Sequence, residues 1–288
     1  MYIKNNKIYI YNNDIKSFKK NQFHRFLKES IFSGRIIIFR NNYFIIKIIN
    51  LVSNLIQEYL KTESITDLNI KNNNIKKFDN LIINIQKNIK NNTKLKKVFG
   101  SFLNFIEFSN HETFIDKITL RYTSPLKSQT IGILKPLISH RDTWGSNIPE
   151  QVNWWLPLSD IKNQNSIFIL RKEFNRPVKN DSKEWNFLKY KKDSKRLSSS
   201  PTSSKEFIIQ PESIIRIKRG DLLCFSGHHL HGSKQDDFYR VNLETRTVSK
   251  NDSKIFKIPR NIDNFQKKKQ LNWFFNIFNS SVLGKSNY

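Results

Sequence analysis

Three residues of this chain have the types and spacing of a metal site, and they come from two separate segments. His140 and Asp142 are two residues apart, so in an extended chain their side chains point to the same side while Arg141 points away. His231 follows much later, near the end of an apolar run that begins after Gly220. Two imidazoles and one carboxylate form a facial site for iron(II) that leaves coordination positions open. We therefore expect His140, Asp142 and His231 to hold Fe(II).

Two further histidines compete for the place of the distal ligand. His228 and His229 stand in the same run as His231, and the end of a strand read from sequence can slip by a residue or two. A His-x-x-His spacing also occurs in zinc sites, so the cluster alone does not name the metal. The spacing to the polar residues that follow, Ser233 and Arg240, favours His231 over its two neighbours.

Arg240 is a candidate for binding an organic anion beside the metal. Arginine pairs bidentately with carboxylates, and a guanidinium buried in a strand needs an anionic partner. Two histidines and one aspartate leave iron(II) with a net charge of about +1, which suits a chelating dicarboxylate. We expect a dicarboxylate co-substrate to bind the metal by a keto-acid end and Arg240 by its distal carboxylate. Ser233 would add a hydroxyl, and O2 would be the second co-substrate.

Several weaker candidates lie on neighbouring elements. Arg121 and Thr123 share one face of an expected strand, where a contact with the co-substrate or the substrate and a structural role are equally good interpretations. Asn153 and Trp155 share a face of another strand, and Trp144 lies two residues beyond Asp142. We assign Thr123 to the co-substrate and the other four to the substrate, although packing in the core is the more common role for a tryptophan.

The pattern of apolar residues indicates helices first and short strands afterwards. Period-two alternation marks strands and wider spacing marks amphipathic helices. The expected helices span residues 14–33, 44–60, 75–89 and 98–108. The expected strands span residues 7–11, 35–40, 118–123, 151–158, 166–170 and 239–248, with a hairpin made by residues 213–217 and 222–225. We therefore predict an α+β protein with a mainly β core, of the jelly-roll or cupin type.

The same pattern indicates one domain over residues 1–288. Residues 1–114 form a helix-rich flank and residues 115–250 the catalytic core. Residues 174–207 are long, polar and charged, which is typical of a lid or of a mobile loop. Residues 251–288 form a tail whose aromatic stretch, residues 264–283, would pack on the core, contact a second copy or lie on a membrane.

Composition limits the partners and the compartment. The single cysteine, Cys224, excludes an internal disulfide and favours a cytoplasmic protein. No run of apolar residues is long enough for a transmembrane helix. The net charge is +26, but the lysines are scattered through every segment. A nucleic-acid footprint should be a patch, so we expect a small-molecule substrate, with a preference for anions, and no nucleic acid. The sequence does not indicate the oligomeric state.

Six motifs together give a resemblance to a known family, over about residues 118 to 250. They are His140-Arg-Asp-Thr-Trp-Gly-Ser-Asn147, Gln151-Val-Asn-Trp-Trp-Leu-Pro157, Asn165-Ser166, Pro177-Val-Lys-Asn180, Phe225-Ser-Gly-His-His-Leu-His231 and Arg240-Val-Asn-Leu-Glu-Thr-Arg-Thr-Val248. With them the chain resembles the phytanoyl-CoA dioxygenase-like branch of the iron(II)/2-oxoglutarate-dependent oxygenases.

This resemblance implies a double-stranded β-helix, iron on His140, Asp142 and His231, and 2-oxoglutarate on Arg240 and Ser233. It also implies hydroxylation of a small metabolite, sugar or acyl-type substrate. Related halogenases have a small residue where this chain has Asp142, so the carboxylate points to oxygen transfer instead.

Two other functions remain open from the sequence. Nucleic-acid dealkylating oxygenases share the metal triad and carry an Arg-x-Asn-x-x-x-Arg run, which Arg240, Asn242 and Arg246 match in outline. The short distance from His231 to Arg240 in the sequence counts against this family. A jelly-roll binding module without catalytic activity is the second alternative, and the complete set of ligands counts against it.

Overall fold

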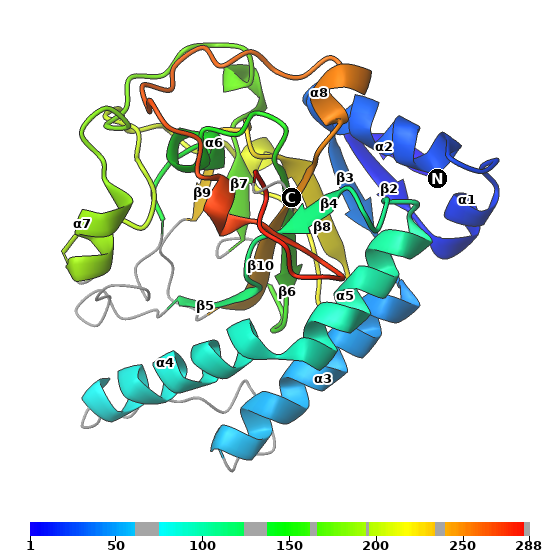
Figure 1. Ribbon diagram of the computed structural model, residues 1–288, viewed down its shortest axis with the longest axis horizontal. Helices are drawn as coiled ribbons and strands as arrows, with labels where there is room; N and C mark the ends of the chain where they lie inside the picture. Colours follow the sequence, from blue (N-terminus) through cyan, green and yellow to red (C-terminus); the bar gives the residue numbers. More distant parts are fainter. Residues whose placement is uncertain (61–74, 124–136, 162–165, 194–195, 234–239, 285–288) are drawn as a thin grey trace.

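A large β-sheet lies at the centre of the molecule, with helices on one face and a small second sheet on the other (Figure 1). The structure is a computed structural model that describes residues 1–60, 75–123, 137–161, 166–193, 196–233 and 240–284. The expected mixture of helices with a dominant sheet is confirmed. Of the predicted iron ligands, His231 lies in the small sheet, His140 is bridged to it, and Asp142 begins the short helix that follows His140.

The large sheet has the order β1-β2-β3-β8-β6-β10-β4-β11, with β5 also paired to β10. Its strands are β1 (Tyr2–Lys4), β2 (Lys7–Ile10), β3 (Ile36–Phe39), β4 (Thr113–Ile115), β5 (Thr119–Thr123), β6 (Val152–Pro157), β8 (Leu222–Ser226), β10 (Arg240–Ser249) and β11 (Phe275–Asn276). The longest, β10, pairs antiparallel with β6 on one side and with β5 and β4 on the other. Alternation along β10 therefore decides which side chains face the helices and which face the small sheet.

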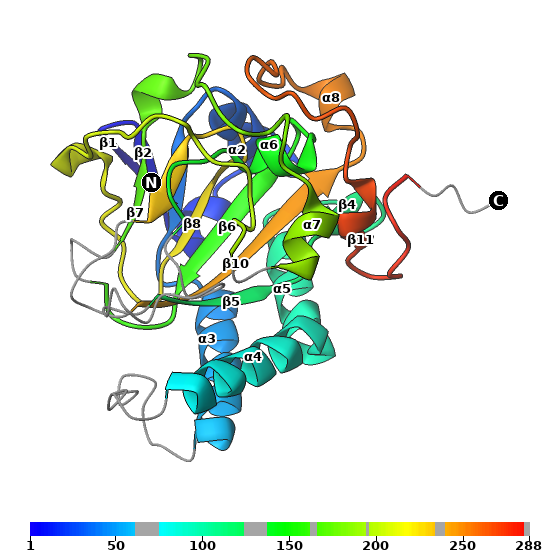
Figure 2. The ribbon, with the colours of Figure 1, turned by 90° about the vertical axis from the view of Figure 1, so that its left-hand side faces the viewer.

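The N-terminal helices cover the face of the sheet that carries Trp154. They are α1 (Asn12–Lys16), α2 (Gln22–Phe32), α3 (Tyr43–Leu60), α4 (Ile75–Asn91) and α5 (Thr93–Phe105). Later in the chain follow α6 (Asp142–Ser146), α7 (Phe187–Lys192) and α8 (Asp252–Ile255). Helices α2, α3 and α5 bury their apolar sides in one core with strands β3, β6 and β8. Trp154 lies inside this core, with the ring of Phe102 edge-on at 5.8 Å. Figure 2 shows α3, α4 and α5 grouped at one end of the sheet.

The small sheet consists of β7 (Ile167–Ile169) and β9 (His231–Ser233). Its apolar side chains, including Ile167 and Ile169, pack against Trp155 and Phe225 of the large sheet. An isolated bridge joins His140 to His231 and extends the small sheet by one segment. The two sheets thus face each other, and two segments that carry predicted ligands become neighbours.

Two expected elements differ from the structure, and in each case a distant partner is the reason. The helix predicted over residues 14–33 is two helices, α1 and α2. The chain breaks at Asn21, which has a positive φ of 65° and whose N–H donates to Glu107 at 2.8 Å. The predicted hairpin is wrong because Ile215 donates its N–H to Ile167 of β7, while β8 pairs with β3 and β6.

The insert of residues 174–207 and the tail both pack onto the core. In the insert, residues 194 and 195 lie outside the described residues. The rest folds back on itself, with Asp181 donating to the main chain of Thr202, and Ser203 donates to Ser139 beside the ligand His140. The tail contributes β11 and the fully buried Phe274. Among the described residues, no helix is long and apolar enough to cross a membrane.

Candidate metal centre

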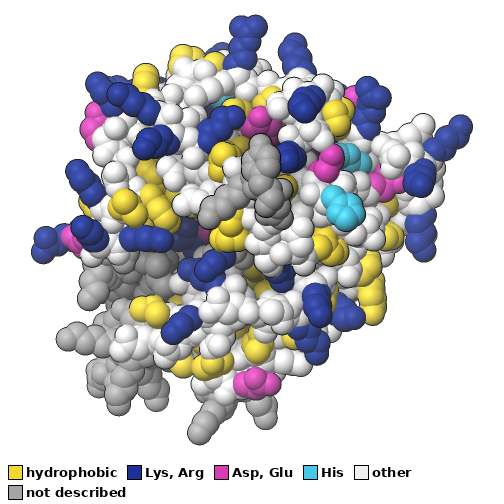
Figure 3. Space-filling model, viewed as in Figure 1, with side chains coloured by type: hydrophobic (Ala, Val, Ile, Leu, Met, Phe, Trp, Pro, Cys, Tyr) yellow, Lys and Arg dark blue, Asp and Glu magenta, His cyan; other side chains and the backbone are white. Residues whose placement is uncertain are grey.

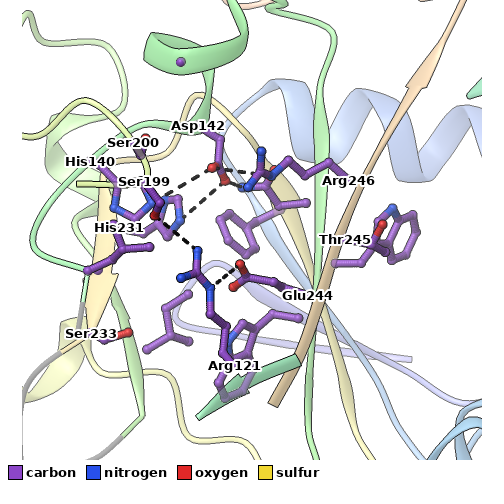
Figure 4. Close-up of a pocket in the computed structure, with 18 of the residues that line it drawn as sticks. Arg121, His140, Asp142, Ser199, Ser200, His231, Ser233, Glu244, Thr245 and Arg246 are labelled. Atoms are coloured by element: carbon purple, nitrogen blue, oxygen red, sulfur yellow. Dashed lines mark hydrogen bonds and ion pairs between the residues drawn. The ribbon is translucent and has the colours of Figure 1, made fainter. Parts of the chain in front are cut away.

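A cavity between the two sheets contains the predicted ligands. Its volume is about 820 Å³ when the space open to solvent at its mouth is included. Figure 4 shows His140, Asp142 and His231 gathered at one side of it. Two groups of polar side chains lie along the rest of the wall, one around Arg240 and one around Arg121.

The three predicted ligands come together in the structure. One donor atom from each of His140, Asp142 and His231 lies within 4.8 Å of the others, and all three residues are buried. The Nε2 atom of His140 is 4.0 Å from Oδ1 of Asp142, and Nε2 of His231 is 3.6 Å from Oδ2. The main-chain N–H of His140 donates to the carbonyl oxygen of His231 at 2.9 Å, and that of His231 donates to the carbonyl oxygen of His140 at 3.0 Å. These two hydrogen bonds hold the imidazoles side by side. This arrangement presents three donor atoms to one point.

Hydrogen bonds to the main chain orient both imidazoles. Nδ1 of His140 lies 2.8 Å from the carbonyl oxygen of Ile138, and Nδ1 of His231 lies 2.9 Å from that of His229. A carbonyl accepts only, so each Nδ1 carries the proton and each Nε2 keeps its lone pair for a metal. Burial lowers the pKa of both histidines, that of His231 to about 4. Both rings are therefore neutral at pH 7, as ligation requires.

Asp142 remains a carboxylate although it is buried. Burial alone raises its pKa, but Arg246, the two histidines and a hydrogen bond from Asn153 lower it to about 2. Asn153 donates to Oδ2 at 2.5 Å, and Gln151 in turn donates to Asn153 at 2.9 Å. Nε of Arg246 is 3.5 Å from Oδ1 of Asp142. Two neutral imidazoles and one held carboxylate fit iron(II).

The residues predicted for 2-oxoglutarate form a second group in the same cavity. Arg240 donates to the hydroxyl of Ser233 at 2.7 Å and to that of Thr123 at 3.3 Å. Its Nε donates to Oδ1 of Asn242 at 3.1 Å. Arg240 is 4% exposed, and burial lowers the pKa of its guanidinium to about 10. A buried cation among hydroxyls and an amide is a suitable place for a carboxylate, because the attraction between the charges is strong away from water.

Arg121 belongs to a third group, which sequence reasoning found only in part. Its Nε donates to Glu244 at 2.7 Å, and its Nη2 lies 3.4 Å from the hydroxyl of Ser199 in the insert. Figure 4 shows this chain of contacts running from Ser199 through Arg121 to Glu244. Ser200 also lines the cavity. The insert thus supplies part of the cavity wall.

Two predicted substrate residues have other roles in the structure, and one keeps its place. Asn153 holds Asp142, as described above. Trp144 is fully buried and does not line the cavity; its indole N–H donates to Asp263 of the tail at 2.7 Å. The prediction that Trp144 forms a wall of the substrate site is therefore corrected. Trp155 does line the cavity, and the guanidinium of Arg240 lies 5.6 Å from its ring centre.

The competing histidines are placed away from the ligand cluster. Both ring nitrogens of His229 face main-chain oxygens, that of Ser226 at 3.2 Å and that of Gly34 at 3.0 Å. His228 is 2% exposed and lies edge-on to the ring of Phe174. Neither belongs to the group of atoms that converge on one point.

Sequence reasoning assigned no role in the site to Glu244, Arg246 or the insert serines. A signal for the first two was present: Arg240, Asn242, Glu244 and Arg246 alternate along one strand, so they share one face. The amide nitrogen of Asn242 is buried and has no hydrogen-bond partner among the described residues, and it belongs to the same face. Ser199 and Ser200 carried no such signal, because a long loop gives no register.

Comparisons with known proteins give only distant likenesses. No family model matches the chain, and no curated protein matches it. Among solved structures, EvdO2 from Micromonospora carbonacea var. aurantiaca is 13% identical, covers 78% of this chain and 91% of its own, and has a TM-score of 0.43. The non-heme monooxygenase ThoJ is 11% identical with 77% of each chain covered and a TM-score of 0.42.

A third solved structure is the non-heme alpha ketoglutarate dependent epimerase SnoN from nogalamycin biosynthesis. It is 8% identical, covers 79% of this chain and 82% of its own, and has a TM-score of 0.39. SnoN is also known in complex with Fe3+, alpha ketoglutarate and nogalamycin RO. Likenesses this low in identity and TM-score do not assign an activity, so the function has to be argued from the residues of the site.

Proposed function

We propose that this protein is an iron(II)/2-oxoglutarate-dependent dioxygenase that hydroxylates a small molecule. The observation that carries the proposal is the pairing of two groups in one cavity: the His140, Asp142 and His231 cluster, and the Arg240, Ser233 and Thr123 cluster. The first supplies the donor set for iron(II), and the second supplies a buried cation for a carboxylate.

The chain's own residues perform three tasks in this function. The main-chain oxygens behind His140 and His231 keep the Nε2 lone pairs directed at the metal, and Asn153 keeps Asp142 in place. Arg240 orients the co-substrate by its distal carboxylate, and on the same face lies the amide nitrogen of Asn242, which has no hydrogen-bond partner among the described residues. Ser199 and Ser200 of the insert form part of the cavity wall and would limit the access of water on that side. Bound iron(II) would supply the activation of O2, coupled to oxidation of 2-oxoglutarate.

The overall reaction balances as substrate C–H, 2-oxoglutarate and O2 giving substrate C–OH, succinate and CO2. In this proposal Asp142 is a ligand, so no room is left for a halide in its place. We infer that the two facing sheets are the two halves of a double-stranded β-helix and that the chain belongs to the phytanoyl-CoA dioxygenase-like branch; the facing sheets and the motifs of residues 118 to 250 support this. The substrate class is a small metabolite, sugar or acyl compound. The net charge of +26, with Lys and Arg side chains spread over the face of the molecule shown in Figure 3, favours an anionic one.

Anaerobic titration of the metal-free protein with iron(II) and then 2-oxoglutarate tests the proposal. We expect a charge-transfer absorption band when both are bound, and succinate release when O2 is admitted with a pool of candidate substrates. Asp142→Ala should abolish metal binding. Arg240→Met should leave metal binding intact and weaken the binding of 2-oxoglutarate. The affinity of Arg240→Lys for 2-oxoglutarate should lie between those of Arg240→Met and the wild type. Absence of the band in the wild-type protein, or no difference between Arg240→Met and wild type, would contradict the proposal.

A further inference from the structure

Arg141, which lies between two of the proposed ligands, joins the metal centre to three other segments. Its side chain is fully buried and points away from the ligand cluster. The guanidinium donates to four main-chain oxygens, those of Glu173 at 2.6 Å, Arg176 at 2.8 Å, Phe174 at 3.3 Å and His228. One side chain thus ties residues 140–142 to the start of the insert and to the turn that precedes His231.

The carboxylate that faces Arg141 comes from the C-terminal tail. Oδ2 of Asp263 accepts from Nε of Arg141 at 3.1 Å and from the N–H of Val178 at 3.0 Å, while Oδ1 accepts from the indole of Trp144 at 2.7 Å. Asp263 is 5% exposed. In Figure 1 the tail, in orange and red, runs from α8 across the end of the molecule that carries α6. The pair is therefore enclosed and formed between segments far apart in the sequence.

The contacts of Asp263 fall on both sides of Asp142. Arg141 precedes this ligand, and Trp144 follows it in α6, the short helix that Asp142 itself begins. The next tail residue, Asn264, donates to the main-chain oxygen of Thr143 at 2.6 Å. The guanidinium of Arg141 and the carboxylate of Asp263 are both buried and form an ion pair at 3.1 Å, so without this carboxylate a buried cation would lose its counter-charge.

We propose that Asp263 is a positioning residue of the metal centre, which fixes the direction of His140 and Asp142 by pairing with Arg141 and Trp144. The metal centre is then complete only when the C-terminal tail is docked. This inference rests on the proposed metal-binding function. Asp263 acts through its neighbours, because it belongs to neither the ligand cluster nor the cavity wall.

A matched pair of variants separates positioning from simple loss of stability. Asp263→Asn removes the charge at the proposed clamp. Asp252→Asn removes the charge of another buried aspartate of the C-terminal region, 2% exposed, which pairs with the buried Lys28 and joins α8 to α2 away from the cavity. Each variant is titrated without oxygen with Co(II) as a spectroscopic substitute for iron(II), and its unfolding by urea is measured.

We expect Asp263→Asn to weaken Co(II) binding ten- to hundredfold and to change the visible Co(II) spectrum, as loss of an orienting partner does in other metal sites. Asp252→Asn should lose stability while keeping the wild-type affinity and spectrum. Wild-type binding by Asp263→Asn, or equal losses of affinity in both variants, overturns the inference.

Two further outcomes are distinguishable. If Asp263→Asn does not fold, Trp144→Phe decides: this change removes the indole N–H bonded to Asp263 but keeps an aromatic ring and leaves the Arg141–Asp263 pair in place. It should still weaken Co(II) binding severalfold and alter the spectrum. An unchanged affinity and spectrum in Trp144→Phe would then overturn the inference. If the wild-type protein binds no metal, the proposed function fails and this inference fails with it.

Discussion

At the scale of single residues, the hydrogen bond from Asn153 to Asp142 yields a direct prediction. Asn153→Leu keeps the side-chain volume but removes the donor 2.5 Å from Oδ2. Loss of such an orienting partner usually weakens metal affinity ten- to hundredfold. We therefore expect a drop of about this size in iron(II) or Co(II) affinity, measured by anaerobic titration. A residue that touched only the substrate would leave metal affinity unchanged.

The control for this variant lies on the same strand. Trp154 faces the helices, is 1% exposed, and donates to the hydroxyl of Thr247 at 2.9 Å. Trp154→Phe should cost stability through lost packing and a lost hydrogen bond, with metal affinity as in the wild type. Comparable losses of metal affinity in the two variants would refute the role assigned to Asn153.

The ligands and the residues around Arg240 could be predicted from sequence because their spacing is local. His140 and Asp142 are on one side of an extended segment whatever its neighbours are. The partners of Asp142 could not be found in this way. Asn153 and Arg246 meet it only because β6 and β10 pair in the register that sets Arg246 opposite Asn153. The register between two strands that are far apart in the chain cannot be read from the sequence of either strand alone.

At the scale of elements, the strand that carries His231 depends on a glycine. A Cβ atom built on Gly232 would lie 2.7 Å from the ring of Phe168 in β7 and 3.0 Å from the main-chain oxygen of Leu137. Gly232→Ala should therefore push β9 away from both neighbours and displace His231. We expect a loss of about 1–3 kcal/mol in unfolding free energy, as for other overpacked sites, together with weaker metal binding.

A second-site change tests that explanation. Phe168→Leu makes room for the methyl group on one side, so the double variant should recover part of the lost stability and metal affinity relative to Gly232→Ala alone. Urea unfolding and Co(II) titration measure the two quantities. Full tolerance of Gly232→Ala would show that the close contact at β9 relaxes without cost.

Elements in which apolar residues recur at a regular spacing could be found from the sequence. Elements whose bounds or pairing depend on a partner far away in the chain could not. Strands β6 and β10 alternate strongly and lie where expected. The segment of residues 213–217 alternates too, but it follows β7 through Ile215 instead of turning back onto β8. The break between α1 and α2 depends on Glu107, which accepts hydrogen bonds from Asn21 and Phe23. Local propensity does not contain such tertiary contacts.

At the scale of the whole molecule, buried neutral histidines make the stability of the protein depend on pH. The pKa is lowered, mainly by burial, to about 3 in His24 and His228 and to about 4 in His229. In the unfolded chain these groups titrate near 6.5. Between pH 6.5 and 4 the unfolded state therefore binds more protons than the folded state, and the free energy of unfolding falls as the pH is lowered.

The expected loss between pH 7 and pH 5 is at most about 2 kcal/mol for each of these histidines, from the ordinary pKa and the linkage relation. The contribution of His24 can be measured separately, because this residue lies outside the metal site. Its ring packs edge-on against Phe108, with 4.8 Å between the ring centres, and its Nε2 is buried. His24→Phe should keep this packing. It should also make the free energy of unfolding less dependent on pH, because one proton fewer is taken up on unfolding. Urea unfolding of the metal-free protein at pH 7 and pH 5 measures both slopes. Equal slopes in the variant and the wild type would show that folding does not lower the pKa of His24.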